Sequence, residues 1–237
     1  MARQRAAFAD FAWVHVGNTH LELWAATDNS DLPDGCTLPI VHGFAIEPRD
    51  LEQDIKHLAQ AGIACKAPRR FATPGVCGQP VTQFTNAVIL DVSAPTCCIF
   101  FCEWGLQGTI FPWEPGLSTQ DRRMRDRADF DKSGGGALGL VGLSKISFHY
   151  RNPDEARKKW RAITGADNPA PAAIDGVALD ISEGLQDAVA GLTFAVRSPE
   201  KARRFLSERG LLDASSDDGI RLRPCATGGL AINFVSA

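Results

Sequence analysis

The sequence predicts an α+β protein built from repeated β-α-β-β-β modules, of which the first is incomplete. Three observations support this prediction. A strand, a proline, a helix and a glycine recur in that order three times along the chain. Further strand-like apolar segments follow the helices, and a hairpin pattern precedes the first complete unit. Such a recurrence is typical of a duplicated supersecondary module.

The N-terminal segments 8–16 and 19–24 predict two strands joined at Gly17 and Asn18, a pair suited to a two-residue hairpin turn. They correspond to the closing strands of a module whose opening strand and helix are missing. We therefore count this fragment as the first module, and the unit that follows it as the second.

The second module opens with an alternating apolar segment at 40–46, followed by a proline and a helix predicted over 49–61. The apolar face of that helix is formed by Leu51, Ile55 and Leu58. Gly62 is the left-handed residue expected after its last turn. Strands predicted at 85–92 and 97–104 close the module.

Two further copies of the opening strand and helix lie in the C-terminal half. One runs from a strand at 146–150 to Gly165, and the other from a strand at 192–196 to Gly210. The N-cap, first-turn and capping-box residues of the former are Asn152, Pro153 and Glu155. Closing strands are predicted at 176–181, 220–223 and 230–235, which leaves the middle copy shortened.

Between the halves, the segment 113–138 is predicted as a linker or surface loop that separates an N-terminal half (1–112) from a C-terminal half (139–237). A Pro-Gly pair and three consecutive glycines favour a loop. The alternative is a lid whose four arginines grip an anionic substrate. Interleaved aspartates weaken that alternative, because they would neutralise the grip.

The composition is that of an ordinary globular protein. Its 237 residues are 44% hydrophobic and 22% charged, which excludes a disordered chain. No apolar run approaches the roughly 18 residues of a membrane helix, and the net charge of −3 gives no general attraction to nucleic acid or anionic lipid. No long apolar segment follows the basic N-terminus, so we expect a cytoplasmic protein without a secretory signal. Cys97, Cys98 and Cys102 form no C-x-x-C pair and are interpreted as buried thiols in a reducing compartment.

Three residues are candidate metal ligands because of their positions in strands. His42 lies in the opening strand of the second module, Glu103 in its last strand, and Glu22 in the equivalent strand of the first. A lone glutamate is costly to bury among apolar residues. Two carboxylates and an imidazole that face one cavity would bind a divalent cation, whose charge would offset their repulsion. The alternative is that each side chain points outward or pairs with an arginine.

His20 is a further candidate ligand. It lies two residues before Glu22, so both side chains emerge on the same face of the strand. It is a fourth ligand, a partner that orients Glu22, or an ordinary strand histidine. We assign no chemical role to His15, His57 or His149. The sequence has no P-loop, dinucleotide fingerprint, nucleophile elbow or H-E-x-x-H motif.

With these modules, with His42 inside the segment 41–46, and with the block Ile-Phe-Phe-Cys-Glu-Trp-Gly at 99–105, the chain resembles the vicinal oxygen chelate superfamily. More narrowly, it resembles the glyoxalase-like domain proteins, in which a module ends in a similar apolar-Glu-Trp strand. The segment Leu-Glu-Leu at 21–23 is similar to the closing strand of their first module. The resemblance spans most of the chain.

This resemblance implies curled mixed sheets around a divalent metal, which a substrate chelates through adjacent oxygens. It implies metal ligands at Glu22, His42 and Glu103. The fourth ligand position belongs to the missing opening strand of the first module and has no counterpart here. The chain therefore has a three-ligand open site, a site completed by His20 or by another chain, or a scaffold that has lost its metal.

Two functions from different classes follow. The first is a metal-dependent enzyme that acts on a small oxygenated compound, as an isomerase or lyase, a dioxygenase or a hydrolase. Its cation (iron, manganese, zinc or nickel) would polarise a carbonyl, and Glu22 or Glu103 would act as the general base. The second is a non-catalytic protein that sequesters a small hydrophobic molecule. The expected pocket residues are Trp24, Phe44, Phe101, Trp104 and Trp113. In both cases the expected partner is a small molecule, and the sheet edges of the incomplete module predict a homodimer.

Overall fold

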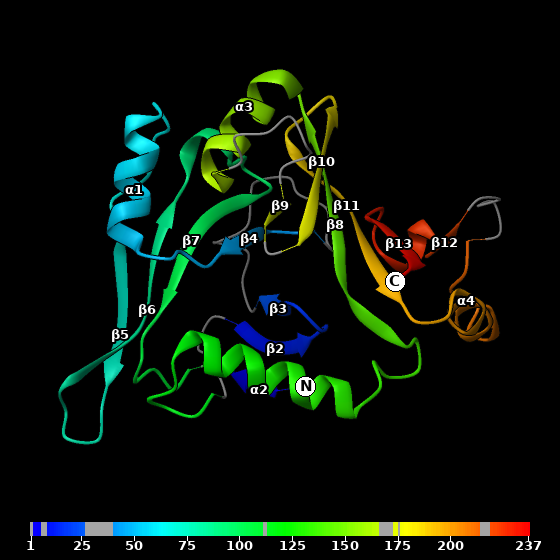
Figure 1. Cartoon of the computed structure of the whole chain (residues 1–237), viewed down its shortest axis with the longest axis horizontal. Helices are drawn as coiled ribbons and strands as arrows, with labels where there is room; N and C mark the ends of the chain where they lie inside the picture. Colours follow the sequence, from blue (N-terminus) through cyan, green and yellow to red (C-terminus); the bar gives the residue numbers. More distant parts are fainter. Residues whose placement is uncertain are drawn as a thin grey trace.

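The computed structural model describes residues 2–5, 9–26, 40–110, 113–165, 173–174, 176–213 and 219–237, which contain three β-sheets (Figure 1). The strands of the N-terminal half are β1 (Ala2–Arg5), β2 (Ala9–His15), β3 (His20–Ala26), β4 (Gly43–Ile46), β5 (Arg69–Pro74), β6 (Pro80–Val88) and β7 (Cys98–Trp104). Those of the C-terminal half are β8 (Leu140–Tyr150), β9 (Ala173–Ile174), β10 (Val177–Glu183), β11 (Ala188–Val196), β12 (Ile220–Arg221) and β13 (Ala231–Ser236). The helices are α1 (Leu51–Gln60), α2 (Thr119–Lys132), α3 (Pro153–Thr164) and α4 (Pro199–Glu208), with single 3-10 turns at η1 (Leu90–Val92) and η2 (Pro224–Ala226). Within these described ranges, the helices lack the length and apolarity needed to span a bilayer.

One pairing rule recurs in the modules and confirms that they are repeats. In each, the opening strand lies parallel to the closing strand, as β4 does to β7, β8 to β10, and β11 to β13. A parallel pair needs a crossover connection, which begins with α1, α3 or α4. The expected α+β class of repeated modules with mixed sheets is therefore confirmed.

The two halves of the chain use their opening strands differently. In the C-terminal half, β8 and β11 pair antiparallel, which merges two modules into one sheet with the order β12-β13-β11-β8-β10-β9. Register shifts along this pair bend the sheet. In the N-terminal half, β1, β2 and β3 form a separate antiparallel sheet, and β4 is the edge of the sheet β4-β7-β6-β5. The described residues thus show the first module as incomplete, with β1 as an additional strand that the sequence did not predict.

Local sequence signals place α1 and α3 where the sequence predicts helices. The Asn152 side chain accepts a hydrogen bond from the backbone N–H of Glu155 at 3.2 Å, and Pro153 occupies the first turn of α3. Gly62 and Gly165 follow the last turns of α1 and α3 with φ angles of 75° and 67°. Other residues pay a steric penalty in this left-handed region, so glycine ends both helices.

One continuous hydrophobic core connects the two larger sheets. Trp160 of α3 and Ile99 of β7 are both completely buried in it. The Trp160 Nε1–H donates to the Tyr150 hydroxyl at 3.0 Å, and that hydroxyl donates to the Val92 carbonyl at 3.0 Å. This buried chain of hydrogen bonds joins β8 and α3 to η1 of the other half.

Two expectations about local structure were wrong. The segment predicted as a linker or loop contains the 14-residue helix α2, whose N-cap Ser118 accepts a hydrogen bond from the Asp121 N–H. Among the three clustered thiols, Cys97 and Cys102 are buried, but Cys98 is only half-buried; all three are free cysteines.

Helix α2 lies at the bottom of the molecule in the view of Figure 1, below β2 and β3. Arg122 is buried and donates to the carbonyls of Gly105 and Leu106, just after β7. Arg123 pairs with Glu47, just after β4, at 2.7 Å. These two arginines therefore bind groups of the protein itself. Part of the positive charge that suggested a lid for an anionic substrate is thus used within the protein.

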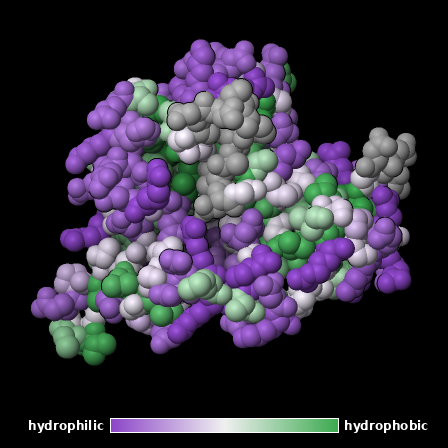
Figure 2. All heavy atoms as spheres, viewed as in Figure 1, coloured by the Kyte–Doolittle hydropathy of each residue, from purple (hydrophilic) through white to green (hydrophobic). Residues whose placement is uncertain are grey.

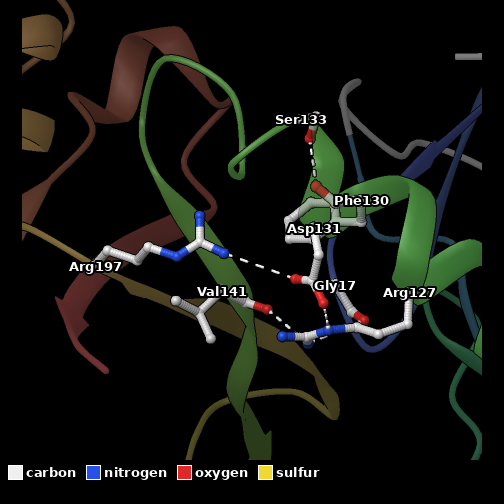
Figure 3. A network of polar contacts seen from close by, with 7 residues as sticks. All are labelled: Gly17, Arg127, Phe130, Asp131, Ser133, Val141 and Arg197. Atoms are coloured by element: carbon white, nitrogen blue, oxygen red, sulfur yellow. Dashed lines mark hydrogen bonds and ion pairs between the residues drawn. The ribbon is translucent and has the colours of Figure 1, made fainter.

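The second half of α2 contacts the other two sheets. Arg127 donates to the carbonyls of Gly17 and Val141, each at 3.4 Å, and pairs with Asp131 at 3.1 Å (Figure 3). Asp131 lies 3.7 Å from Arg197, which follows β11. Figure 3 shows these groups converging between α2, the β2–β3 turn and β8. Thus α2 connects the N-terminal hairpin to both larger sheets.

Candidate metal and ligand sites

One face of the β2–β3 hairpin gathers most of the candidate chemistry. Residues opposite each other in an antiparallel pair project to the same side. Three such pairs are Phe11 with Trp24, Trp13 with Glu22, and His15 with His20. We call these six side chains the hairpin face. The sequence predicted the hairpin and three of these residues as functional, which are Glu22, His20 and Trp24.

Glu22 lies in the middle of the hairpin face. The residue as a whole is exposed, yet the packing around its carboxyl raises the pKa, because desolvation disfavours the charged form. A hydrogen bond with the Trp13 side chain acts in the opposite direction. Glu22 therefore holds its proton more readily than an ordinary glutamate.

His42 lies just before β4 and next to the hairpin face. Its ring centroid is 5.4 Å from that of Trp24. Within the described part of the chain, His42 Nδ1 and Trp24 Nε1 are buried and make no hydrogen bond. Buried polar atoms normally have a partner, so this pair marks a place suited to a ligand, an ion or water.

Glu103 is exposed on β7. The regular register of β6 with β7 places Glu103 on the strand face that carries the buried Phe101, opposite the face of Cys102 and Trp104. Burial, together with the charges of Glu47, Glu22 and Glu103, raises the pKa of Cys102 to about 12. Glu22 and Glu103 thus lie near the same thiol.

The structure brings together a different set of ligand atoms. Among the His, Cys, Asp and Glu side chains of the described ranges, one group could bind a metal ion together. It consists of His15, His20 and Asp126, whose ligand atoms all lie within 4.8 Å of one another. Glu22, His42 and Glu103 form no group of that kind. His20, the further candidate, contacts His15 and Asp126.

This cluster joins the end of the hairpin to α2. His20 Nε2 lies 3.3 Å from Asp126 Oδ2, and the rings of His15 and His20 are 4.6 Å apart. Trp113 Nε1 donates to the same Asp126 oxygen at 2.8 Å. All three candidate ligands are half-buried.

The electrostatics of the cluster favour a charged carboxylate and a neutral imidazole. Burial acts to raise the pKa of Asp126, but hydrogen bonds from His20 and Trp113 outweigh it and lower the pKa. Burial lowers the pKa of His15, and the nearby His20 lowers it further. Ionised carboxylate and neutral imidazole are the forms that bind metal ions.

Sequence reasoning gave no role to His15 or Asp126. The signal for His15 was available, because the two histidines flank the hairpin turn symmetrically and must face the same side. For Asp126 the chain offered no local signal, since its position depends on how α2 docks against a distant hairpin.

The predicted pocket residues lie in different environments. Phe101 is 3% exposed and belongs to the core, and Phe44 packs against that core. Trp104 contacts Phe84 and Trp113 at ring-centroid distances of 5.7 and 5.3 Å. An open groove of about 710 Å³ lies between α4, β12 and β13, and a hollow of about 280 Å³ lies on α2. Neither is lined by a predicted site residue.

The surface in Figure 2 is mostly hydrophilic over α1 and α3. Apolar side chains gather at the tip of the β5–β6 hairpin, where Val76 and Cys77 are exposed (Figure 2). That tip lies far from the β2–β3 hairpin in Figure 1.

No family model matches the chain, and no curated protein matches it. Among solved structures, a hypothetical protein from Staphylococcus aureus aligns with a TM-score of 0.54 and 10% identity, over 97% of this chain and 85% of that one. A Mn(II)-bound glyoxalase from Novosphingobium aromaticivorans aligns with a TM-score of 0.52 and 13% identity, over 98% and 72%. These likenesses concern the fold alone: the chain shares the fold of a solved glyoxalase, as the resemblance implied.

Proposed function

We propose that this chain is a divalent-metal-dependent enzyme that acts on a small oxygenated compound at the hairpin face, as an isomerase or lyase or as a dioxygenase. The observation that carries the proposal is the desolvated carboxyl of Glu22 on the same face as Trp24, whose ring lies 5.4 Å from that of His42 with its unpartnered Nδ1. The fold shared with a Mn(II)-bound glyoxalase supports it.

The residues present fit a metal by their chemistry. Glu22, His42 and Glu103 would supply one nitrogen and two oxygen donors, a set that suits iron, manganese, zinc or nickel. In the tautomer that carries its proton on Nε2, the unpartnered Nδ1 of His42 would offer the lone pair that such a bond requires. A cation bound there would act as a Lewis acid toward a substrate carbonyl.

Glu22 is the better candidate for the glutamate that would leave the metal and act as general base. Its raised pKa lies closer to neutral pH than that of an exposed glutamate, and a base works best when its pKa is near the operating pH. The Trp13 side chain fixes its carboxyl by a hydrogen bond. Trp24 packs against His42 on one side of the proposed site.

Metal analysis of the full chain, purified without chelator, tests the proposal. We expect bound transition metal in the wild type and at least about a tenfold loss in Glu22→Gln, His42→Ala and Glu103→Gln, because each removes one ligand. Glu52→Gln and His57→Ala, on the exposed side of α1, are the matched controls and retain the metal. Full metal content in all three site variants would contradict this ligand set.

A non-catalytic binding protein is the second candidate, and two observations favour it. Glu103 faces away from Trp104, and a row of aromatic rings runs from β5 to the loop before α2. Its ring-centroid distances are 5.0 Å for Phe71–Phe84, 5.7 Å for Phe84–Trp104 and 5.3 Å for Trp104–Trp113. A native mass spectrum that shows a bound small hydrophobic molecule and no metal would favour this function over the enzyme.

A further inference from the structure

We propose that His15, His20 and Asp126 form a divalent transition-metal site, separate from the predicted set of Glu22, His42 and Glu103, which fastens α2 to the β2–β3 hairpin. We call these three residues the hairpin–α2 triad. The proposal does not depend on the proposed function, because it uses other residues and predicts a structural effect.

The geometry of the triad suits an ion. Ligand atoms bonded to one cation at 2.0–2.2 Å lie about 3.0–3.5 Å from each other. His20 Nε2 and Asp126 Oδ2 are already 3.3 Å apart, and the ligand atoms of all three residues lie within 4.8 Å. In the described part of the chain, the buried Nδ1 of His15 has no hydrogen-bond partner. Two imidazoles and one carboxylate are a donor set for zinc, iron or nickel.

The triad side chains are held in place by their neighbours. Trp113 Nε1 donates to Asp126, and the Trp113 ring packs edge-on against Trp104 with the Arg122 guanidinium 4.9 Å from its centroid. The Phe130 ring meets the His15 ring edge-on at 5.5 Å. Groups that orient metal ligands in this way raise the affinity of a site.

One positive charge opposes a cation here, and the structure compensates for it. Arg127 lies near enough to lower the pKa of His15. Its guanidinium is turned toward Asp131 and toward the carbonyls of Gly17 and Val141 (Figure 3). The carboxylate of Asp131, which also lies 3.7 Å from Arg197, therefore offsets part of the Arg127 charge.

Such a site would cross-link segments that are far apart in the sequence. The two histidines belong to the hairpin, whereas Asp126 belongs to α2, which also contacts both larger sheets. A metal that binds the folded state and not the unfolded chain stabilises the folded state. Its effect is expected first on the docking of α2.

Zinc binding by the chelator-treated full chain tests the proposal. In equilibrium dialysis we expect Asp126→Asn and His15→Asn to lose about one equivalent of Zn²⁺ relative to the wild type. Asp126→Asn keeps an oxygen acceptor for Trp113 and so leaves the packing intact. The matched control is Asp129→Asn, on the exposed side of the same helix, which retains the equivalent.

Hydrogen exchange measured by mass spectrometry provides the second readout. Zn²⁺ should slow exchange of the α2 amides by about fivefold or more in the wild type, Asp129→Asn and Glu103→Gln, and leave Asp126→Asn unchanged. Equal Zn²⁺ binding by the wild type and Asp126→Asn would overturn the triad. Retention of this equivalent by Glu103→Gln separates the triad from the predicted ligand set, whatever the outcome for the latter.

Discussion

Tyr150 shows how one polar group can join the two halves of the molecule. The residue is 6% exposed, and its hydroxyl is bonded on both sides, to Trp160 Nε1 and to the Val92 carbonyl. Both partners are buried, so water cannot take the place of the hydroxyl group if it is removed. A buried hydrogen-bonding group that loses its partner costs about 1–3 kcal/mol.

We therefore predict that Tyr150→Phe lowers the free energy of unfolding by about 1–3 kcal/mol, measured by urea denaturation at pH 8. The change removes only the hydroxyl and leaves the ring to fill its space. Ser133→Ala is the control, because its hydroxyl bonds a carbonyl at the exposed end of α2 and its loss costs little. Equal stability of Tyr150→Phe and the wild type would show that the bonded hydroxyl contributes nothing.

We also predict that the difference in stability between the wild type and Tyr150→Phe depends on pH. Burial raises the pKa of Tyr150 above the ordinary value of 10.0. Above pH 10 the unfolded chain loses this proton while the folded protein keeps it, so the wild type loses stability as the pH rises. Tyr150→Phe has no such proton, and the difference between the two proteins should narrow above pH 10.

At the scale of elements, α2 depends on tertiary contacts. Its buried side chain is Arg122, which donates to the carbonyls of Gly105 and Leu106 at 3.2 and 3.0 Å. Its surroundings lower the pKa of Arg122 through burial, yet the guanidinium stays charged at all ordinary pH values. The helix is therefore attached through a polar group.

Arg122→Ala should lower the free energy of unfolding by about 1–3 kcal/mol and accelerate hydrogen exchange in α2, because it removes the charged donor that attaches the helix to both carbonyls. The carbonyls themselves keep their backbone donors, the N–H groups of Gly108 and Gly116. Arg125→Ala is the matched control on the same helix. Arg125 is exposed and pairs with Glu114, and such surface pairs contribute about 1 kcal/mol or less. Similar effects of the two variants would mean that Arg122 does not attach the helix.

The contrast between α2 and the other helices explains what the sequence could predict. Asn152 and Gly165 act on their own helix, so the bounds of α3 follow from local residues. Polar residues surround α2 on every side, and no apolar stripe indicated a helix there. The pairing of His15 with His20 followed from the hairpin, but the approach of Asp126 depends on long-range docking that no local pattern encodes.

At the scale of the whole molecule, the modules of the two halves are joined differently. In the C-terminal half, β8 and β11 cover each other's edges. In the N-terminal half, the opening strand that would pair with β4 is absent from the described residues, and β4 remains an edge. Exposed strand edges are templates for pairing with another chain.

The free edge of β4 indicates where two copies of the chain would meet in the predicted homodimer. The Cys98 N–H bonds the His42 carbonyl, so residues 42, 44 and 46 turn their backbone groups toward β7, whereas Gly43 and Ala45 turn theirs outward. Gly43 and Ala45 are also exposed. A second copy could therefore pair with β4 at these two residues.

Light scattering should give twice the mass of a single chain for the wild type. Ala45→Pro removes an N–H on the free side of β4 and leaves the bonds to β7 in place, so we expect it to give the mass of one chain with an unchanged circular dichroism spectrum. Ala72→Ser, on the other edge strand of the same sheet, keeps every backbone donor and should remain dimeric. A monomeric wild type would show that β4 needs no partner, and a dimeric Ala45→Pro would place the contact elsewhere.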